Sequence, residues 1–191
     1  KKDHENAVLA ELRPGQSVEL LKELHILTRE GRLNQDSRRK LKQVEHLVQF
    51  IEKILAEVTP LGDELTLADH GAGKSYLGFI LYDLLLKGAG SGTVYGIETR
   101  PELVERARAL AQRLGFARMR FLNIAAADAA HDAALPDRID VVTALHACDT
   151  ATDDAIAFGL AKQAQAMVLV PCCQAELAAR QGQIARAREA L

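Results

Sequence analysis

The chain has 191 residues, of which 48% are hydrophobic and 26% are charged, and its formal net charge is −2. This composition is typical of a soluble globular chain with one sizeable domain and a small extension. The charge excludes a global attraction to nucleic acid but leaves room for a local basic patch. Apolar runs such as "MVLV" are too short to span a bilayer, and no basic start with a long apolar core indicates a secretory leader. We therefore expect a cytoplasmic protein without a membrane partner.

The N-terminal part of the chain carries helical periodicity. Apolar residues recur at steps of three and four across residues 16–58, with a break at Gly31 and a helix cap expected at Asp36 or Ser37. The stretch "TPLGDE", residues 59–64, is rich in residues that favour turns and predicts a boundary between two units of the chain. We thus predict a helical N-terminal segment, residues 1–60, before a second unit, residues 61–191.

Strands and helices alternate after this boundary. The predicted strands are "LTLAD", "TVYGIE", "MRFLNI", "RIDVVTALHA" and "AMVLVP". The predicted helices cover residues 74–87, 100–115, 153–164 and 175–190. Such alternation predicts an α/β fold, in which a parallel sheet is covered by helices on both faces.

A glycine-containing loop follows the first predicted strand. The stretch "LADHGAGKSYLG", residues 67–78, fits a loose P-loop pattern and also a methyltransferase-like D-x-G-x-G loop. A P-loop enzyme needs an acid after a second strand to hold Mg²⁺, yet the later strands lead to His146 and Pro171 instead. A dinucleotide fingerprint fails because Tyr76 stands where the third glycine belongs. The methyltransferase interpretation is therefore the stronger one.

That interpretation assigns further residues near the loop. Gly71 and Gly73 permit a tight turn, and Asp69 can engage the ammonium group of a methionine moiety, directly or through water. Glu98 ends the second strand, where a carboxylate can accept hydrogen bonds from both ribose hydroxyls. The alternative for Glu98 is a solvated acid at a strand end. The residues predicted to bind the cofactor S-adenosylmethionine are Asp69, Gly71, Ala72, Gly73, Glu98, Thr99, Asn123, Ile124 and His146.

Four stretches resemble one group of proteins. "LADHGAGKSYLGFIL", "VYGIE", "VVTALHACDTATDDAI" and "VLVPCCQAEL" are similar to class I methyltransferases that carry D-x-G-A-G-K, L-H-A-C and P-C-C motifs. The resemblance covers about residues 65–178 and implies a Rossmann-like core that binds S-adenosylmethionine. It also implies a relation to the tRNA ribose 2′-O-methyltransferases that act on the acceptor stem.

The chain departs from this group at three points. Ser75 replaces a glycine, and Asp149 stands where the group tends to have glycine before an acid. The last two strands of the class I sheet have no counterpart, and the chain starts at Lys1 and stops inside a predicted helix. We therefore expect the core to be C-terminally truncated and the chain to be part of a longer protein.

The catalytic candidates follow the fourth and fifth strands. His146 is the best general-base candidate because histidine titrates near neutrality, although a structural histidine is an equal alternative. Asp149 either orients His146 or caps the following helix. These polar residues follow the carboxyl ends of neighbouring strands, which is where ligands bind in an open parallel sheet.

The three cysteines are open to several interpretations. Cys148, Cys172 and Cys173 are odd in number and two are adjacent, so we expect reduced thiols. Cys148 and Cys172 occupy places where RNA cytosine-C5 methyltransferases carry reactive thiolates, which makes them catalytic candidates. Simple packing of small side chains is the favoured alternative. A metal site with His146 lacks C-x2-C spacing, so we predict no metal.

The expected acceptor is RNA, either tRNA or rRNA. The stretch "TREGRLNQDSRRKLK", residues 28–42, holds six basic residues, which suits RNA phosphates. A solvated helix face is at least as good an explanation. Two rivals to a methyltransferase stay open: a non-catalytic module that binds S-adenosylmethionine, and a P-loop nucleotide-binding protein. The sequence does not indicate an oligomeric state.

Overall fold

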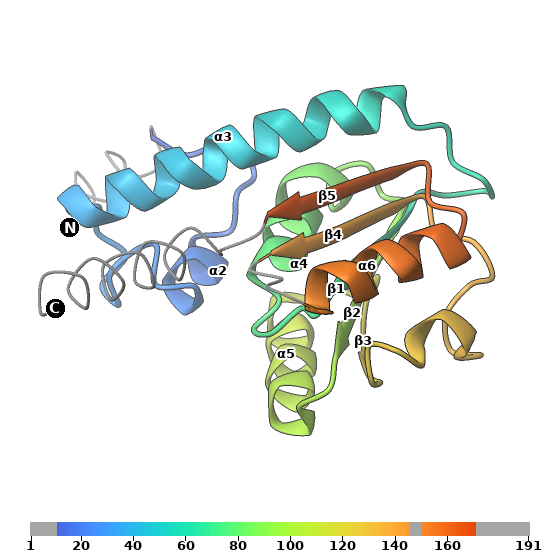
Figure 1. The fold of residues 1–191 in the computed structure, drawn as a ribbon. Coiled ribbons are helices and arrows are strands. Elements are labelled where there is room, and N and C mark those ends of the chain that lie inside the picture. The colour runs from blue at the N-terminus through green and yellow to red at the C-terminus, as the bar shows by residue number, and fades with distance from the viewer. Residues whose placement is uncertain (1–10, 146–149, 171–191) are drawn as a thin grey trace, which may run out of the picture.

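The computed structural model describes residues 11–145 and 150–170 (Figure 1). Its five strands are β1 (Thr66–His70), β2 (Thr93–Glu98), β3 (Met119–Asn123), β4 (Val141–Leu145) and β5 (Ala166–Val170). Its α-helices are α2 (Val18–Glu23), α3 (Gln35–Glu57), α4 (Tyr76–Leu81), α5 (Pro101–Leu114) and α6 (Thr150–Ala161). A π-helical turn, η1 (Tyr82–Leu86), continues α4, and a 3-10 turn, η2 (Ala129–His131), precedes β4.

The strands form one parallel sheet in the order β3-β2-β1-β4-β5. Leu67 of β1 pairs with Val94 of β2 on one side and with Val141 of β4 on the other. The chain therefore winds outward in both directions from β1. The predicted α/β Rossmann-like fold is confirmed, and every strand predicted from the sequence is present.

Helices cover both faces of the sheet, as Figure 1 shows, with α6 in front and α4 and α5 behind. The face behind belongs to a large core in which Leu67, Phe79 and Val94 are fully buried. A smaller core lies under α6, where Phe158 packs with the residues of β1 and β4 that point to that side. The central strands β1, β2 and β4 are almost entirely buried, as strands covered on both faces are, whereas the edge strand β3 exposes Arg120 and Asn123.

The N-terminal helices pack into the large core rather than standing apart from it. Leu20 and Leu21 of α2 and Val48 and Ile51 of α3 are almost completely buried within that core. The side chain that caps α3 is Asn34, whose carbonyl oxygen accepts a hydrogen bond from the Ser37 amide at 2.8 Å. The cap expected at Asp36 or Ser37 was wrong by two or three positions, because an asparagine with extended backbone satisfies the same amides.

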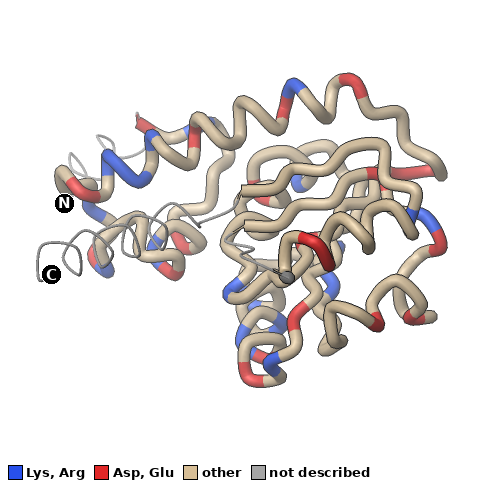
Figure 2. Tube along the Cα trace, viewed as in Figure 1, with Lys and Arg blue, Asp and Glu red and all other residues tan. Residues whose placement is uncertain are grey.

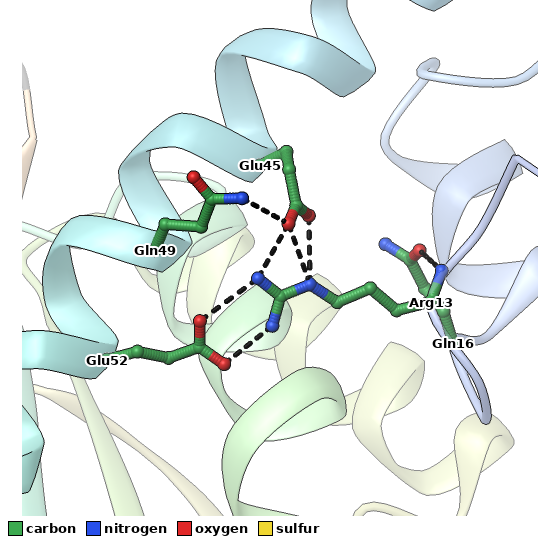
Figure 3. A network of polar contacts seen from close by, with 5 residues as sticks. All are labelled: Arg13, Gln16, Glu45, Gln49 and Glu52. Carbon is green, nitrogen blue, oxygen red and sulfur yellow. Dashed lines mark hydrogen bonds and ion pairs between the residues drawn. The ribbon is translucent and has the colours of Figure 1, made fainter.

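An ion-pair network joins the start of the described chain to α3 (Figure 3). The Arg13 guanidinium donates to Glu45 at 2.7 Å and to Glu52 at 2.6 Å, and Gln49 donates to the same Glu45 carboxylate at 3.0 Å. The two acids are seven residues apart, which is two helical turns, so they lie on one face of α3. The network fixes the segment before α2 along the middle of α3.

Two expectations about the chain ends stay predictions. The helix expected at residues 175–190 lies outside the described residues, and the final strands of a class I sheet are not tested. Within the described parts of the chain, no helix is long and apolar enough to cross a membrane.

Candidate functional site

The carboxyl ends of the strands gather the predicted cofactor residues at one edge of the sheet. His70 pairs with Ile97, and Glu98 pairs with Asn123, so the ends of β1, β2 and β3 lie side by side. The Ala72 amide donates to the Ile97 carbonyl at 2.8 Å, which pins the loop after β1 against β2. The structure therefore brings the glycine loop and Glu98 together, as expected from the sequence.

The glycine loop runs through left-handed backbone. Gly71 has a φ of +65° and Gly73 a φ of +57°, conformations that favour glycine. A Cβ built on Gly71 would meet no atom within 4 Å, so its outer side is open. Ser75 also adopts a left-handed φ of +54°, a conformation that glycine adopts more readily than serine.

Asp69 lies behind the loop and not in it. Its carboxylate accepts hydrogen bonds from the Thr143 hydroxyl at 3.0 Å, the Ser75 hydroxyl at 3.2 Å and the Gly78 amide at 3.3 Å. Burial raises the pKa of this carboxyl to about 6, although the three hydrogen bonds act in the opposite direction. Its exposed fraction is 2%, so it shapes the loop from behind, and its predicted contact with an ammonium group stays a prediction.

Glu98 faces the glycine loop. One carboxylate oxygen accepts the Gly73 amide at 2.7 Å, and the other accepts the Arg100 amide at 3.0 Å and the Arg100 Nε at 2.9 Å. Burial would raise the pKa of Glu98, but the hydrogen bonds from Arg100 and Gly73 outweigh it and lower the pKa to about 2. Glu98 is therefore an ionised hydrogen-bond acceptor next to the open side of the loop.

Thr99, Asn123 and Ile124 complete this part of the edge. The Thr99 hydroxyl donates to Glu98 at 3.2 Å. The Asn123 side-chain amide donates to the carbonyls of Glu98 and Thr99 at 3.1 and 2.8 Å, and the Ile124 amide donates to the Glu98 carbonyl at 3.2 Å. Asn123 and Ile124 thus fix the backbone around Glu98, and their direct contact with a cofactor stays a prediction.

Sequence reasoning missed three residues of this site. Thr143 is a hydroxyl residue inside the apolar run "VVTAL", a signal that a buried partner must exist, and that partner is Asp69. Arg100 follows Glu98 by two residues and binds it. The His70 ring packs against Phe158 with ring centres 5.1 Å apart, and its buried Nε2 has no hydrogen-bond partner among the described residues. Burial lowers the pKa of His70, which keeps the ring neutral.

The catalytic candidates cannot be placed. His146, Cys148, Asp149 and Cys172 all lie outside the described residues, as does Cys173, so their roles stay predictions. Within residues 11–145 and 150–170, no group of three or more potential ligands is arranged to hold a metal ion.

The P-loop interpretation finds little support in the loop geometry. The hydroxyl that would bind Mg²⁺ belongs to Ser75, which is 1% exposed and donates to Asp69. The ammonium that would hold phosphate belongs to Lys74, and it lies 5.8 Å from the centre of the Tyr76 ring. Neither group points to a phosphate held by the loop.

Solved structures with a similar fold include two proteins, of which the first is a methyltransferase by its description. Magnesium protoporphyrin IX methyltransferase from Synechocystis PCC 6803, solved with S-adenosylhomocysteine, is 18% identical, with a TM-score of 0.50 over 79% of this chain and 64% of that one. The YcgJ protein from Bacillus subtilis is 21% identical, with a TM-score of 0.46 over 63% of this chain and 47% of that one. The chain spans less than two thirds of the length of each. No curated protein matches the sequence.

The match to a family is more direct. Residues 39–180 match the family model described as a methyltransferase domain, which is most of the chain and includes all five strands. The open glycine loop, the ionised acid that ends β2 and the strand order agree with this match. The chain therefore belongs to the methyltransferase-domain family.

Proposed function

We propose that the chain binds S-adenosylmethionine at the carboxyl edge of β1 and β2 and acts as a methyltransferase. The observation that carries the proposal is the Glu98 carboxylate, which is ionised, ends β2 and faces the open side of the glycine loop. A carboxylate in this position accepts hydrogen bonds from a ribose diol. Arg100 donates to both carboxylate oxygens of Glu98, and its side chain is 58% exposed.

The donor set fits this cofactor better than it fits a nucleotide phosphate. The Glu98 carboxylate accepts from the Gly73 amide of the loop, so it occupies a backbone donor that a phosphate would need, and its charge would repel the phosphate. When bound, S-adenosylmethionine supplies an electrophilic methyl group on its sulfonium. The chain would hold the ribose through Glu98 and keep the glycine backbone close to the ligand, while Asp69 holds the loop in shape through Ser75 and Gly78.

RNA is the acceptor that we propose, and its relation to tRNA ribose methylation stays a prediction. Support comes from the L-H-A-C and P-C-C motifs and from Lys74 and Arg106 near the loop, which form no ion pair with a described acid. A non-catalytic module that binds the cofactor is the remaining rival. A cytoplasmic location, expected from the cysteines, is likewise a proposal.

Calorimetric titration with S-adenosylhomocysteine tests cofactor binding. We expect a dissociation constant in the micromolar range, and we expect Glu98→Ala to weaken binding at least tenfold because the ribose acceptor is lost. Glu102→Ala, which removes an exposed acid from the first turn of α5, is the matched control and should bind as the unchanged chain does. Binding of Mg-ATP without S-adenosylhomocysteine would overturn the proposal.

Transfer of radiolabelled methyl groups from S-adenosylmethionine to total RNA separates the enzyme from the non-catalytic module. We expect labelled RNA with the unchanged chain and background label with Glu98→Ala. Tight cofactor binding with only background label on RNA and on protein would favour the non-catalytic module.

A further inference from the structure

Two cavities meet beside the glycine loop. The first, which we call the apolar cavity, has a volume of about 460 Å³ and lies between residues 24–26, the first half of α3 and the start of α4. The second, the cationic groove, has a volume of about 280 Å³ and lies between residues 23–25, the start of α4 and α5. Leu24, His25 and Tyr76 line both, so the two spaces adjoin each other at these residues.

The position of this double cavity links it to the proposed cofactor site. Tyr76 is the first residue of α4 and directly follows the loop of residues 71–75. Leu145, the last residue of β4, closes the apolar cavity at the carboxyl edge of the sheet. The cavity therefore begins where the proposed cofactor site ends, which is where a methyl acceptor must lie.

Tyr76 is the central side chain of the arrangement. It is 36% exposed, one of few large apolar side chains in the described structure that reach the solvent to this extent. The Lys74 ammonium lies 5.8 Å from the centre of its ring. An exposed aromatic ring with a neighbouring cation is the arrangement that stacks a nucleobase and holds its phosphate.

The charge of the cationic groove is positive after its ion pair is counted. Glu23 binds Arg113 at 2.6 Å, and both line the groove. The remaining charged residues of its described lining are Lys74 and Arg106, and neither forms an ion pair with a described acid. The apolar cavity has no acidic residue among its described lining. The whole space therefore suits a ligand that combines a flat ring with negative charge.

The basic segment expected to contact RNA holds most of its cations in ion pairs. Arg38 pairs with Glu11 at 2.9 Å, while Lys40 and Arg39 pair with Asp36 at 2.8 and 3.2 Å. Figure 2 shows the same interleaving of basic and acidic residues along α3. Four of the six cations of residues 28–42 therefore lie in ion pairs, whereas neither Lys74 nor Arg106 forms one with a described acid.

We propose that the double cavity around Tyr76 binds single-stranded RNA, with one base in the apolar cavity on the Tyr76 ring and the adjoining phosphates on Lys74 and Arg106. The inference deepens the proposed function and rests on it, since it identifies the bound segment as the methyl acceptor. The combined space is larger than one nucleotide needs and opens along α5, which favours a strand over a free mononucleotide.

Fluorescence anisotropy with a labelled 12-nucleotide oligouridylate tests the inference, with uridine monophosphate as competitor. We expect Tyr76→Ala to weaken binding about tenfold and Tyr76→Phe to keep it within twofold, because stacking needs the ring and not the hydroxyl. Lys74→Ala and Arg106→Ala should each weaken binding three- to tenfold. Each should also reduce the slope of log K against log salt by about one, because one phosphate contact is lost.

The matched control is Arg39→Ala, which removes an arginine from the sequence-predicted basic segment. It should leave the affinity and the salt slope unchanged. Weaker RNA binding in Arg39→Ala but not in Arg106→Ala would overturn the inference, as would an absence of RNA binding. Displacement of the oligonucleotide by equimolar uridine monophosphate would also overturn it, because the ligand would then be a free nucleotide.

Calorimetry with S-adenosylhomocysteine on the same proteins separates this inference from the proposed function. We expect Arg106→Ala to bind the cofactor product as the unchanged chain does. Cofactor binding without RNA binding would overturn the inference and leave the proposed function intact. RNA binding that depends on Tyr76 and Arg106 without cofactor binding would support the RNA surface and overturn the proposed function.

Discussion

Two opposing effects act on the charge of the Asp69 carboxylate. Burial disfavours its charge, while three donors from β4, the loop and α4 favour it. Gly78 makes this possible, because a Cβ there would lie 2.8 Å from the Ser75 hydroxyl and 3.2 Å from the carboxylate. A single acid thus couples the backbone of the glycine loop to the centre of the sheet.

The raised pKa of Asp69 predicts a pH dependence of stability. The folded protein binds a proton more tightly than the unfolded chain, so the contribution to stability is fully present below pH 3.8 and is lost as the pH rises to about 6. A shift of about two units corresponds to about 3 kcal/mol. Urea unfolding between pH 4 and 7.5 should show the unchanged chain losing this amount relative to Asp69→Asn. Parallel curves for the two proteins would contradict the prediction.

Arg100 competes with the proposed ligand for Glu98. It donates to both carboxylate oxygens, so a ribose diol must displace its guanidinium. We expect Arg100→Ala to bind S-adenosylhomocysteine at least threefold more tightly, because Glu98 stays ionised at neutral pH and loses its competitor. Calorimetry checks this, with Arg138→Ala in an exposed loop as the control. Weaker binding in Arg100→Ala would show that the guanidinium contacts the ligand instead.

At the scale of elements, the widened turn η1 connects the core to the N-terminal segment. It carries Asp83, which is 4% exposed and accepts the Ser17 amide at 2.8 Å and the Lys87 ammonium. Lys87 also donates to the Gly15 carbonyl at 2.8 Å. The π-helical turn therefore ties down the start of α2, which leads directly into the Leu24–His25 edge of the double cavity.

Removing the Asp83 carboxylate should loosen this connection. Asp83→Ala leaves the half-buried Ser17 amide without its acceptor, and we expect a loss of about 1–3 kcal/mol in the free energy of unfolding. Denaturant unfolding measures the loss, and Asp63→Ala at an exposed turn provides the control. An equal effect of the two substitutions would mean that the buried contact contributes nothing.

The sequence predicted elements better than contacts. Strands and helices followed from hydrophobic periodicity, and α5 from Pro101 at its start and Gly115 at its end, because these signals are local. The π-helical turn was not predicted, since it differs from an α-helix by one inserted residue. The alternation of side chains along β1 shows which face of the sheet Asp69 points to. Only the pairing of β1 with β4 shows that the Thr143 hydroxyl donates a hydrogen bond to it there. Long-range partners of this kind leave no local pattern.

At the scale of the whole molecule, the two edges of the sheet have separate tasks. The amino edge is held by Asp140, which is 1% exposed and accepts the Leu61 and Thr66 amides at 2.8 and 2.7 Å and the Gln165 side chain at 3.0 Å. It joins the segment before β1 to β4 and β5. The carboxyl edge, by contrast, carries the loop and Glu98.

Because the two edges are separate, we expect a substitution at the amino edge to change the stability of the fold without changing cofactor binding. Asp140→Asn replaces one of the two carboxylate oxygens with an NH2 donor that faces a backbone amide, and we expect a loss of about 2–3 kcal/mol in unfolding free energy. Its affinity for S-adenosylhomocysteine should stay within twofold at a temperature where it is folded. Asp137→Asn, on an exposed turn, should change neither. A drop in affinity that tracks the loss of stability would show that the edges are coupled.

The strand order also governs how the chain assembles as it is made. β1 is central, yet its neighbour β4 is synthesised only after β2 and β3 are complete. At about 5–20 residues per second, a nascent chain that has released β2 waits on the order of several seconds for β4. During that interval β1 has an open hydrogen-bonding edge flanked by bare apolar faces. The strand order that brings the ligand site together thus leaves the edge of β1 open to pairing with neighbouring nascent chains. The same interval exposes apolar surface to which chaperones bind.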